Sequence, residues 1–399
     1  MTERIEVVVI GGGYAGVMAA NRLTQRDDVT VTLINPRPVF VERIRLHQLV
    51  GGAYDPTVDL RELLAERVRL TVGGVTRIDA AGRTLTLADG GTVGYDYLIY
   101  AVGSGSVDQR VPGAAEYAYP VAGLEEARRL RAALDALPAS AAITVVGAGP
   151  AGIETATELA GAGRRVTLVC GGVLGPYLHP RGRRSVARHS AALGVRVVAG
   201  PGTRVTAVTR HAVRLADGRE LPGDLTVWTT GFGVPDLASR SGLTTDGIGR
   251  LRTDETLTSV DDPRIIAAGD SAAPSGLAYR MGCQSAVQLG PQAAETVLSR
   301  LAGRAPAPVT VGFAGQCISL GRRAGVFQFS HRDDLALRLY VGGRFGAWLK
   351  EFVCRGTVRQ LAHEAKKPGA RKWWAEDRTR PGRVAAHREE SPGTADCRT

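Results

Sequence analysis

The sequence predicts an α/β protein, because short apolar stretches rich in β-branched residues alternate with helix-compatible stretches along the chain. Two of the apolar stretches lead directly into a Gly-x-Gly-x-x-Gly turn, one starting at Gly11 and the other at Gly147. Each turn is followed by a helix-compatible stretch and a second apolar strand, an order typical of dinucleotide-binding units. We therefore expect two Rossmann-like, three-layer (ββα) dinucleotide-binding domains.

The composition agrees with a globular chain of two or three domains, at roughly 100–200 residues per domain. The 399 residues include 51 Gly and 20 Pro, too few for a collagen-like or largely disordered chain. No apolar run is long enough for a transmembrane helix, and the residues before the first strand contain no apolar region of the signal-peptide type, so we expect neither. The five cysteines are far apart and form no Cys-x-x-Cys pair, so we expect no metal site.

The first unit starts with residues 5–10, an apolar stretch too short for a helix, which we expect to be a buried parallel strand. A helix is expected over 17–23 and a second strand over 29–34. The first glycine permits a tight turn, the second lets the backbone approach a pyrophosphate, and the third lets the helix pack closely on the strand. These glycines are Gly11, Gly13 and Gly16. The free N–H groups of the helix N-terminus then favour phosphate binding.

The second unit repeats this order, with strands over 143–146 and 165–169 and a helix over 153–160. Its turn glycines are Gly147, Gly149 and Gly152. Two complete units imply two dinucleotide sites, and a flavin with a nicotinamide nucleotide is the pair we expect.

The acidic residue that commonly binds a ribose at the end of the second strand is absent from both units. Asn35 stands in the first unit and can still hydrogen-bond a ribose hydroxyl, although less strongly than a carboxylate. Cys170 stands in the second unit, which removes the repulsion of a 2′-phosphate without supplying a cation for it. The choice between NADH and NADPH therefore stays open.

Other strands and one long helix complete the expected elements. The strands are residues 68–72, 74–78, 83–87, 95–104, 195–198, 204–208, 213–215, 225–231 and 263–270, and the helix is 282–301. The tail is rich in Arg, Glu, Pro and Gly, a composition that predicts disorder.

Four motifs follow one another along the chain: the first glycine turn, residues 97–104, the second glycine turn with Glu154 behind it, and residues 265–270 ending in Gly-Asp. This order resembles the flavoproteins with two dinucleotide-binding domains, which form the pyridine nucleotide–disulfide oxidoreductase superfamily. The resemblance covers about residues 4–310.

Within that superfamily the chain is most similar to the type II NADH dehydrogenases, which are NADH:quinone oxidoreductases. Residues 283–288 resemble their Ala-Gln-x-Ala-x-Gln quinone-site motif, with Cys283 replacing the first Ala. Residues 313–324, and 346–349 with the following His363, resemble their C-terminal region. The stretch 40–48 lacks the cysteine pair of the disulfide reductases, which excludes disulfide reduction by that route.

The resemblance implies an interleaved organisation. The FAD-binding domain would comprise residues 1–115 and 250–310, and the NAD(P)H-binding domain, 116–249, would be inserted between them. Residues 311–365 would form a C-terminal interface or cap segment. Residues 366–399 are expected to form a disordered basic tail.

The resemblance also implies the site residues. The cofactor-binding residues would be Gly11, Gly13, Tyr14, Ala15, Gly16, Asn35, Arg43, Val75, Ala101, Gly103, Gly147, Gly149, Pro150, Gly152, Gly231, Gly269 and Asp270. The residues nearest the reaction would be His47, Glu154, Gln284 and Gln288. For His47, which lies in a stretch expected near the flavin ring, a purely structural role in an amphipathic helix is an equal alternative.

The implied function is that of an FAD-dependent oxidoreductase, in which non-covalently bound FAD takes a hydride from NADH or NADPH and passes electrons to a quinone-like acceptor. One alternative is a soluble biosynthetic or detoxifying flavoenzyme that acts on a quinone-like or conjugated small molecule. Another is a redox and interaction protein similar to apoptosis-inducing factor.

The expected partner is a small-molecule electron acceptor. The net charge of +11 permits binding of polyanions, but no nucleic-acid motif is present, so we expect no nucleic-acid partner. We expect a cytoplasmic protein whose contact with the inner face of the membrane is at most peripheral, and a homodimer is compatible with the sequence.

Overall fold

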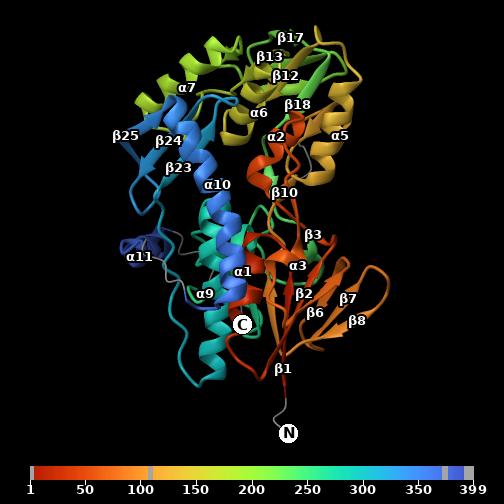
Figure 1. The fold of residues 1–399 in the computed structure, drawn as a ribbon, viewed down its shortest axis with the longest axis vertical. Coiled ribbons are helices and arrows are strands. Elements are labelled where there is room, and N and C mark those ends of the chain that lie inside the picture. The colour runs from red at the N-terminus through yellow and green to blue at the C-terminus, as the bar shows by residue number, and fades with distance from the viewer. Residues whose placement is uncertain (1–3, 107–110, 371–375, 391–399) are drawn as a thin grey trace.

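The computed structural model describes residues 4–106, 111–370 and 376–390. Figure 1 shows two lobes, each built around a sheet, with helix α10 (Gly343–Lys366) running alongside both. The fold class expected from the sequence is confirmed, because the central sheet of each lobe is parallel and carries helices on one face.

The first lobe contains a parallel sheet with the strand order β21-β9-β1-β2-β5. These strands are β21 (Ile265–Ala267), β9 (Tyr97–Tyr100), β1 (Ile5–Ile10), β2 (Val29–Asn35) and β5 (Val68–Val72). One face packs on helices α1 (Tyr14–Leu23) and α9 (Cys283–Leu301). The other face packs on the antiparallel strands β6 (Val75–Asp79), β7 (Thr84–Leu87) and β8 (Thr92–Gly94).

The second lobe repeats this arrangement with the strand order β11-β18-β12-β13-β14. These strands are β11 (Ala118–Pro120), β18 (Leu225–Trp228), β12 (Ala142–Val146), β13 (Arg165–Val169) and β14 (Arg196–Val198). Helices α5 (Leu124–Asp135), α6 (Pro150–Gly161) and α7 (Pro180–Ala192) contribute to the core on one face. Strands β15 (Val205–Val208), β16 (Ala212–Leu215) and β17 (Glu220–Pro222), with helix α4 (Ala114–Tyr117), cover the other.

The first sheet combines strands that are distant in the sequence. Four of its strands precede the second lobe in the sequence, and β21 follows that lobe. Between the lobes, β10 (Gly105–Ser106) pairs with β19 (Phe232–Gly233). The remaining short elements are β3 (Val39–Val41), η1 (Arg43–Arg45), α2 (Leu46–Val50), β4 (Thr57–Asp59), α3 (Leu60–Leu63), α8 (Leu237–Arg240), β20 (Leu251–Thr253), η2 (Gly269–Ser271) and β22 (Ala272–Pro274).

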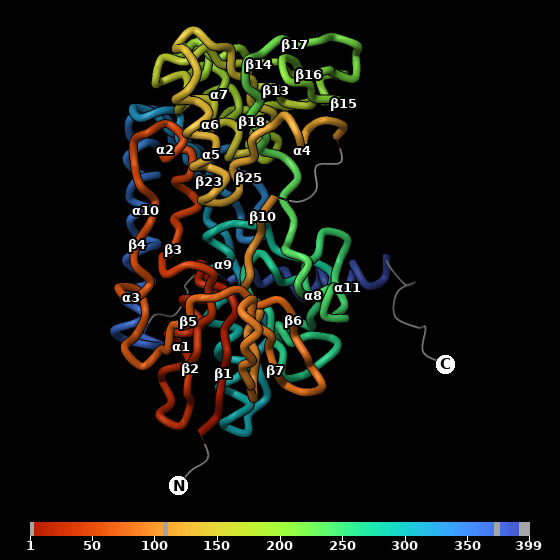
Figure 2. Tube along the Cα trace, turned by 90° about the vertical axis from the view of Figure 1, so that its right-hand side faces the viewer, coloured from red at the N-terminus to blue at the C-terminus, as the bar shows by residue number. Residues whose placement is uncertain are grey.

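The C-terminal part adds a three-stranded antiparallel sheet and the long helix α10. The strands are β23 (Gly315–Ser319), β24 (Gly325–Ser330) and β25 (Ala336–Gly342). Asn21 of α1 ties α10 to the first lobe, because its Nδ2 donates to Leu361 O at 3.3 Å and to Leu63 O at 2.8 Å. Figure 2 also shows α10 beside both lobes, so this helix connects one lobe to the other.

The expectation of a disordered tail over residues 366–399 is wrong for the part that contains helix α11 (Arg380–Glu390). Arg380 is buried, its Nε donates to Glu255 Oε2 at 2.7 Å, and its guanidinium lies 4.1 Å from the centre of the Tyr279 ring. An arginine-rich composition suggests a solvated tail, but a carboxylate and an aromatic face stabilise one buried guanidinium here. Residues 371–375 and 391–399 lie outside the described part of the chain.

Candidate functional site

A cavity of about 1910 Å³ runs along the carboxyl ends of strands from both parallel sheets. Its lining includes the turns that follow β1, β9, β12 and β18, together with parts of α9 and α10. Ligands of open α/β sheets bind at this edge, because the connections that leave the strands separate there.

The first glycine turn opens into this cavity at its second glycine. A Cβ at Gly11, whose φ is +106°, would lie 2.3 Å from Ala101 O, and a Cβ at Gly16 would lie 1.8 Å from Gly11 O. A Cβ at Gly13 would meet no atom within 4 Å among the described residues. Two glycines are therefore required by the protein's own packing, whereas Gly13 leaves space in front of the N-terminus of α1.

The second turn repeats this pattern. A Cβ at Gly147 would lie 2.3 Å from Thr229 Oγ1, and one at Gly152 would lie 2.0 Å from Gly147 O. Gly149, which precedes α6, again has open space within 4 Å of its Cβ position in the described structure. Both turns fit a pyrophosphate, because each offers a helix N-terminus with room for an anion and without an acidic residue in its first turn.

The residues at the ends of the second strands differ in what they do. Asn35 lines the cavity, but its Oδ1 accepts from Gly12 N–H at 2.8 Å and its Nδ2 donates to Arg37 O at 2.7 Å. Its amide therefore holds the glycine turn in shape, and its contact with a ribose stays a prediction. Cys170 also lines the cavity, in the place where a carboxylate was expected from the pattern.

Asp270 lines the cavity, and both of its carboxylate oxygens accept a hydrogen bond. Its Oδ2 accepts from Ser104 Oγ at 2.7 Å, and its Oδ1 accepts from Gly282 N–H at 2.9 Å. Arg43 Nη1 lies 3.6 Å from Asp270 Oδ2 and donates to Ser104 Oγ at 3.0 Å. This network fixes one carboxylate beside the turns that follow β9 and β21.

Glu154 lies in a buried cluster with two basic side chains. Lys350 Nζ of α10 lies 2.9 Å from Glu154 Oε1, which also accepts from Ser319 N–H at 2.9 Å. His47 Nδ1 lies 3.6 Å from Glu154 Oε2, and its Nε2 is buried without a partner among the described residues. Glu154 and Lys350 line the cavity, whereas His47 lies behind its wall.

Burial and the neighbouring charges set the protonation of this cluster. Burial is the main cause that lowers the pKa of His47 to about 4, so the imidazole is neutral at pH 7. Burial tends to raise the pKa of Glu154, but Lys350, His47 and the Ser319 N–H bring it below its usual value. Burial tends to lower the pKa of Lys350, and Glu154 is the main cause that raises it well above its usual value. The site therefore contains a charged Glu154–Lys350 pair beside a neutral histidine.

Gln284 and Gln288, the two glutamines of α9 expected near the reaction, both have hydrogen-bond partners within the protein. Gln288 is fully buried, its Nε2 donates to Gly312 O at 3.1 Å, and its Oε1 accepts from Gly312 N–H at 3.2 Å. Gln284 lines the cavity, and its amide, in the orientation that satisfies both neighbours, donates to Gly315 O and accepts from Ala314 N–H at 2.9 Å each. Gln284 therefore lies at the cavity and its contact with an acceptor stays a prediction, whereas Gln288 faces the core instead of lining the cavity as expected.

The cavity brings together most of the residues expected at the site. Those that line it are Gly11, Gly13, Tyr14, Ala15, Asn35, Arg43, Val75, Ala101, Gly103, Gly149, Pro150, Glu154, Gly231, Gly269, Asp270 and Gln284. Those outside its lining are Gly16, His47, Gly147, Gly152 and Gln288. The three glycines in the second group act through packing, as the steric contacts at their Cβ positions show.

Sequence reasoning missed Lys350, Ser104 and Cys317, which all line the cavity. One signal was present for Lys350, because it is the single lysine before residue 366 in a chain that otherwise uses arginine. Lysine carries a compact charge on a flexible stem, which suits a narrow buried position better than the broad guanidinium of arginine.

Comparison with known proteins decides the family. Residues 5–296 match the model of the pyridine nucleotide-disulphide oxidoreductase family. The chain belongs to this family. It is an NAD(P)H-dependent flavoprotein oxidoreductase, and the expected cofactors, FAD and NAD(P)H, are confirmed at this level.

Curated relatives within the family have related names. An NADH dehydrogenase-like protein of Mycobacterium tuberculosis is 32% identical over 298 residues, which are 67% of this chain and 72% of the relative. The type II NADH:quinone oxidoreductase of the same organism is 31% identical, over 76% of this chain and 74% of its own. The demethylphylloquinone reductase of Synechocystis is 29% identical, over 82% and 87%.

Solved structures share the fold. The sulfide:quinone oxidoreductase of Aquifex aeolicus matches with a TM-score of 0.75 at 20% identity, over 92% of this chain and 93% of its own. NDH2 of Plasmodium falciparum in complex with NADH matches with a TM-score of 0.75 at 16% identity, over 94% and 99%.

Within residues 4–106, 111–370 and 376–390, no helix has the length and apolar character needed to cross a membrane. The same ranges contain no group of three or more His, Cys, Asp or Glu side chains arranged to hold a metal ion.

Proposed function

We propose that this flavoprotein passes electrons from NAD(P)H through FAD to a quinone. In this proposal residues 1–115 and 250–310 bind FAD and residues 116–249 bind NAD(P)H. The observation that carries the proposal is the continuity of the cavity, which joins the two glycine turns and extends to α10. Near α10 its lining includes the apolar side chains of Phe352 and Val353, which suit the ring of a quinone.

The chain's own groups would position the reactants. The helix N-terminus behind Gly13 would hold the FAD pyrophosphate, and the one behind Gly149 would hold that of NAD(P)H. Bound FAD supplies the hydride acceptor and the path of the electrons. Lys350 would present a cation at the wall of the cavity, where it favours an acceptor oxygen that gains negative charge.

The names of two relatives support a quinone acceptor, since one is a type II NADH:quinone oxidoreductase and the other a demethylphylloquinone reductase. The test is steady-state reduction of a water-soluble quinone by the FAD-loaded protein with NADH or NADPH. α10 offers a matched pair of variants, because Phe352 and Phe345 are 59% and 58% exposed and only Phe352 lines the cavity.

We expect Phe352→Ala to raise the KM for the quinone several-fold and Phe345→Ala to leave it unchanged. Neither change should alter reduction of the flavin by NAD(P)H. Equal effects of both changes, or no turnover with any quinone, would contradict the proposal. Flavin that is reduced by NAD(P)H but not reoxidised by quinone would favour a soluble biosynthetic or detoxifying enzyme.

A further inference from the structure

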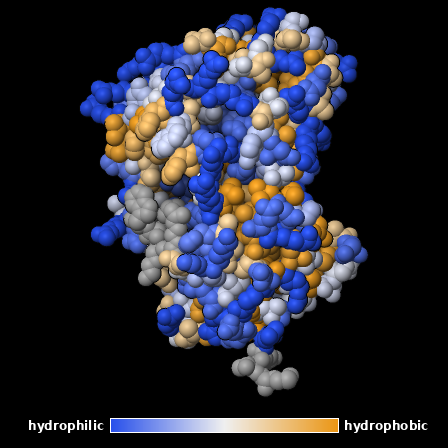
Figure 3. Space-filling model, viewed as in Figure 1, coloured by the Kyte–Doolittle hydropathy of each residue, from blue (hydrophilic) through white to orange (hydrophobic). Residues whose placement is uncertain are grey.

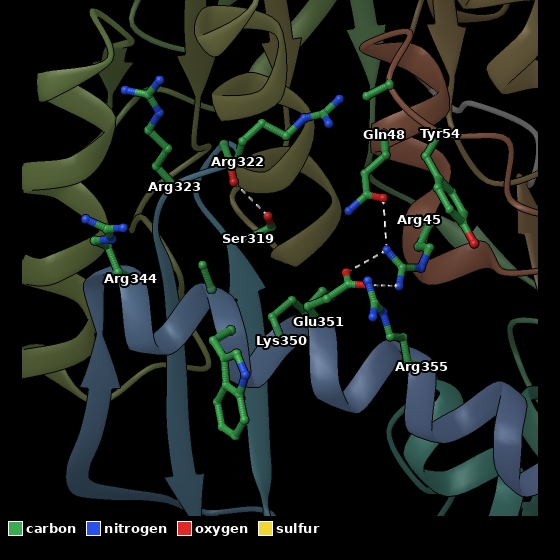
Figure 4. Close-up of a pocket in the computed structure, with 14 residues that line it drawn as sticks. Arg45, Gln48, Tyr54, Ser319, Arg322, Arg323, Arg344, Lys350, Glu351 and Arg355 are labelled. Atoms are coloured by element: carbon green, nitrogen blue, oxygen red, sulfur yellow. Dashed lines mark hydrogen bonds and ion pairs between the residues drawn. The ribbon is translucent and has the colours of Figure 1, made fainter.

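A second pocket of about 700 Å³ lies between α2, the turn that connects β23 and β24, and the first three turns of α10. Figure 4 shows side chains from these three elements around the pocket. Lys350 lines both this pocket and the large cavity, so the two spaces share one wall. None of the residues expected to bind a cofactor or to lie near the reaction lines the second pocket.

The lining of this pocket is strongly cationic. It contains six basic side chains and one carboxylate, that of Glu351. The basic side chains are Arg45, Arg322, Arg323, Arg344, Lys350 and Arg355. Such an excess of positive charge around a concave space attracts anions.

Four of these cations already have carboxylate partners. Glu351 accepts from Arg45 Nη1 and Nη2 at 2.9 Å each, and from Arg355 Nε at 2.6 Å. Arg322 Nε donates to Glu158 at 2.7 Å, and Lys350 pairs with Glu154. Glu351, Glu158 and Glu154 are therefore each paired with a cation of this pocket.

Arg323 and Arg344 differ from the other four. Both are exposed, and within the described part of the chain neither makes an ion pair. Figure 4 shows them on the same side of the pocket, opposite the group formed by Arg45, Glu351 and Arg355. Two free guanidinium groups on one wall provide several N–H donors for one multivalent anion.

The position of Arg344 gives a second, independent reason for an anion here. Arg344 lies in the first turn of α10, a helix of 24 residues with no acidic residue in that turn. The N-terminus of a helix carries partial positive charge, so a cation there is unfavourable by itself. An anion bound between Arg344 and Arg323 removes this repulsion and uses the helix end as a further attractive charge.

Trp348 shows what the rest of the ligand can contact. It lines the pocket, is 57% exposed, and stacks between Phe345 at 5.3 Å and Phe352 at 5.7 Å. On the face shown in Figure 3, hydrophobic residues gather over β25 and the start of α10, beside hydrophilic ones. An apolar surface next to a cationic pocket matches a molecule with a phosphoryl end and an apolar remainder.

We propose that this second pocket binds a phosphoryl group, carried either by the headgroup of an anionic phospholipid or by a soluble phosphate compound. Arg323 and Arg344 bind the oxygens of this phosphoryl group. This proposal does not depend on which acceptor the flavin reduces. The guanidinium groups recognise the phosphate oxygens that the two sources share.

The experiment uses the FAD-loaded protein with saturating NAD⁺, so that both glycine turns are occupied. Inorganic pyrophosphate is titrated by calorimetry, and sedimentation is measured with phosphatidylcholine vesicles with and without phosphatidylglycerol. The test variant is Arg323→Gln/Arg344→Gln. The control is Arg128→Gln/Arg129→Gln, which removes the same charge from two exposed arginines of α5.

We expect the test variant to bind pyrophosphate or the anionic vesicles about tenfold or more weakly, while the control binds as the wild type does. Binding of pyrophosphate without vesicle binding identifies a soluble compound, and phosphatidylglycerol-dependent sedimentation identifies a lipid. The proposal is overturned if the wild type binds neither probe, or if the two charge-matched variants lose binding equally.

Discussion

Lys350 Nζ lies 2.9 Å from Glu154 Oε1, so an ion pair joins the C-terminal helix α10 to α6, the helix that follows the second glycine turn. The side chains of Glu154 and Lys350 are only 7% and 9% exposed. The pair therefore holds helix α10 against the wall of the cavity. Removing one partner leaves an uncompensated charge in a buried place.

Lys350→Met should therefore lower the free energy of unfolding by about 3–5 kcal/mol, because Glu154 loses its buried counter-charge. The double change Lys350→Met/Glu154→Gln should recover most of this loss. Urea unfolding of FAD-saturated protein measures both. Arg214→Gln, which breaks an exposed ion pair with Glu220, serves as the control and should cost at most about 1 kcal/mol. A double variant as unstable as the single one would show that the pair is not the source of the effect.

The glycine turns predict separable losses of cofactor. Gly13→Ala should weaken FAD binding about tenfold or more while the chain still folds, because the new Cβ meets no described atom within 4 Å but occupies the phosphate approach. Gly149→Ala should retain FAD and raise the KM for NAD(P)H by a similar factor.

Fluorescence of released FAD and steady-state kinetics measure these two effects. Gly16→Ala is the comparison for a steric glycine, since its Cβ would lie 1.8 Å from Gly11 O and should destabilise the fold itself. The assignment of the two turns is wrong if Gly149→Ala releases FAD and Gly13→Ala does not.

Asp270→Ala should weaken retention of FAD about tenfold, because the carboxylate that binds Ser104 Oγ and Gly282 N–H is lost from the cavity. Asp262→Ala is the matched control, since Asp262 accepts a hydrogen bond from Arg264 N–H at 2.7 Å and does not line the cavity. The dissociation constant of FAD is measured by fluorescence titration of the apoprotein. Equal weakening by both changes would refute a special role for Asp270.

His47 predicts a specific dependence of stability on pH. Its pKa falls from 6.5 to about 4 on burial, so the unfolded chain takes up a proton that the folded protein resists. Stability is therefore lost as the pH falls from about 6.5 to about 4, by up to about 3 kcal/mol. Glu154, whose pKa is lowered, contributes stability that is lost as the pH falls below its ordinary value of 4.5.

The thermal midpoint of His47→Gln should accordingly depend less on pH between 6.5 and 4 than that of the wild type. The exposed His211, changed to Gln, provides the control and should keep the wild-type dependence. If His47→Gln and wild type lose stability in parallel over this interval, the imidazole is not the group that titrates.

The sequence predicted the local features well, because they depend on neighbouring residues. Strand β1 coincides with the apolar stretch 5–10, and Gly16 is required by its close approach to Gly11 O within the same unit. The pattern predicted that Asn35 hydrogen-bonds a ribose hydroxyl. In the structure the amide oxygen of Asn35 accepts a hydrogen bond from the glycine turn.

Contacts between distant residues could not be predicted in this way. The pairing of Glu154 with Lys350 depends on how α10 packs across both lobes, and no local pattern encodes that packing. Arg380 lies in a stretch whose composition suggests disorder, yet Glu255 and Tyr279 provide it with a buried position. Gln288 belongs to a motif expected at the acceptor side, but its place in α9 turns it toward the backbone of Gly312.

The most direct test of the proposed reaction is anaerobic stopped-flow absorbance of the FAD-loaded protein, mixed first with NADH or NADPH and then with a soluble quinone. The proposal predicts rapid bleaching of the flavin by at least one nucleotide, followed by rapid reoxidation when the quinone is added. Flavin that neither nucleotide bleaches, or that stays reduced in the presence of the quinone, would contradict it.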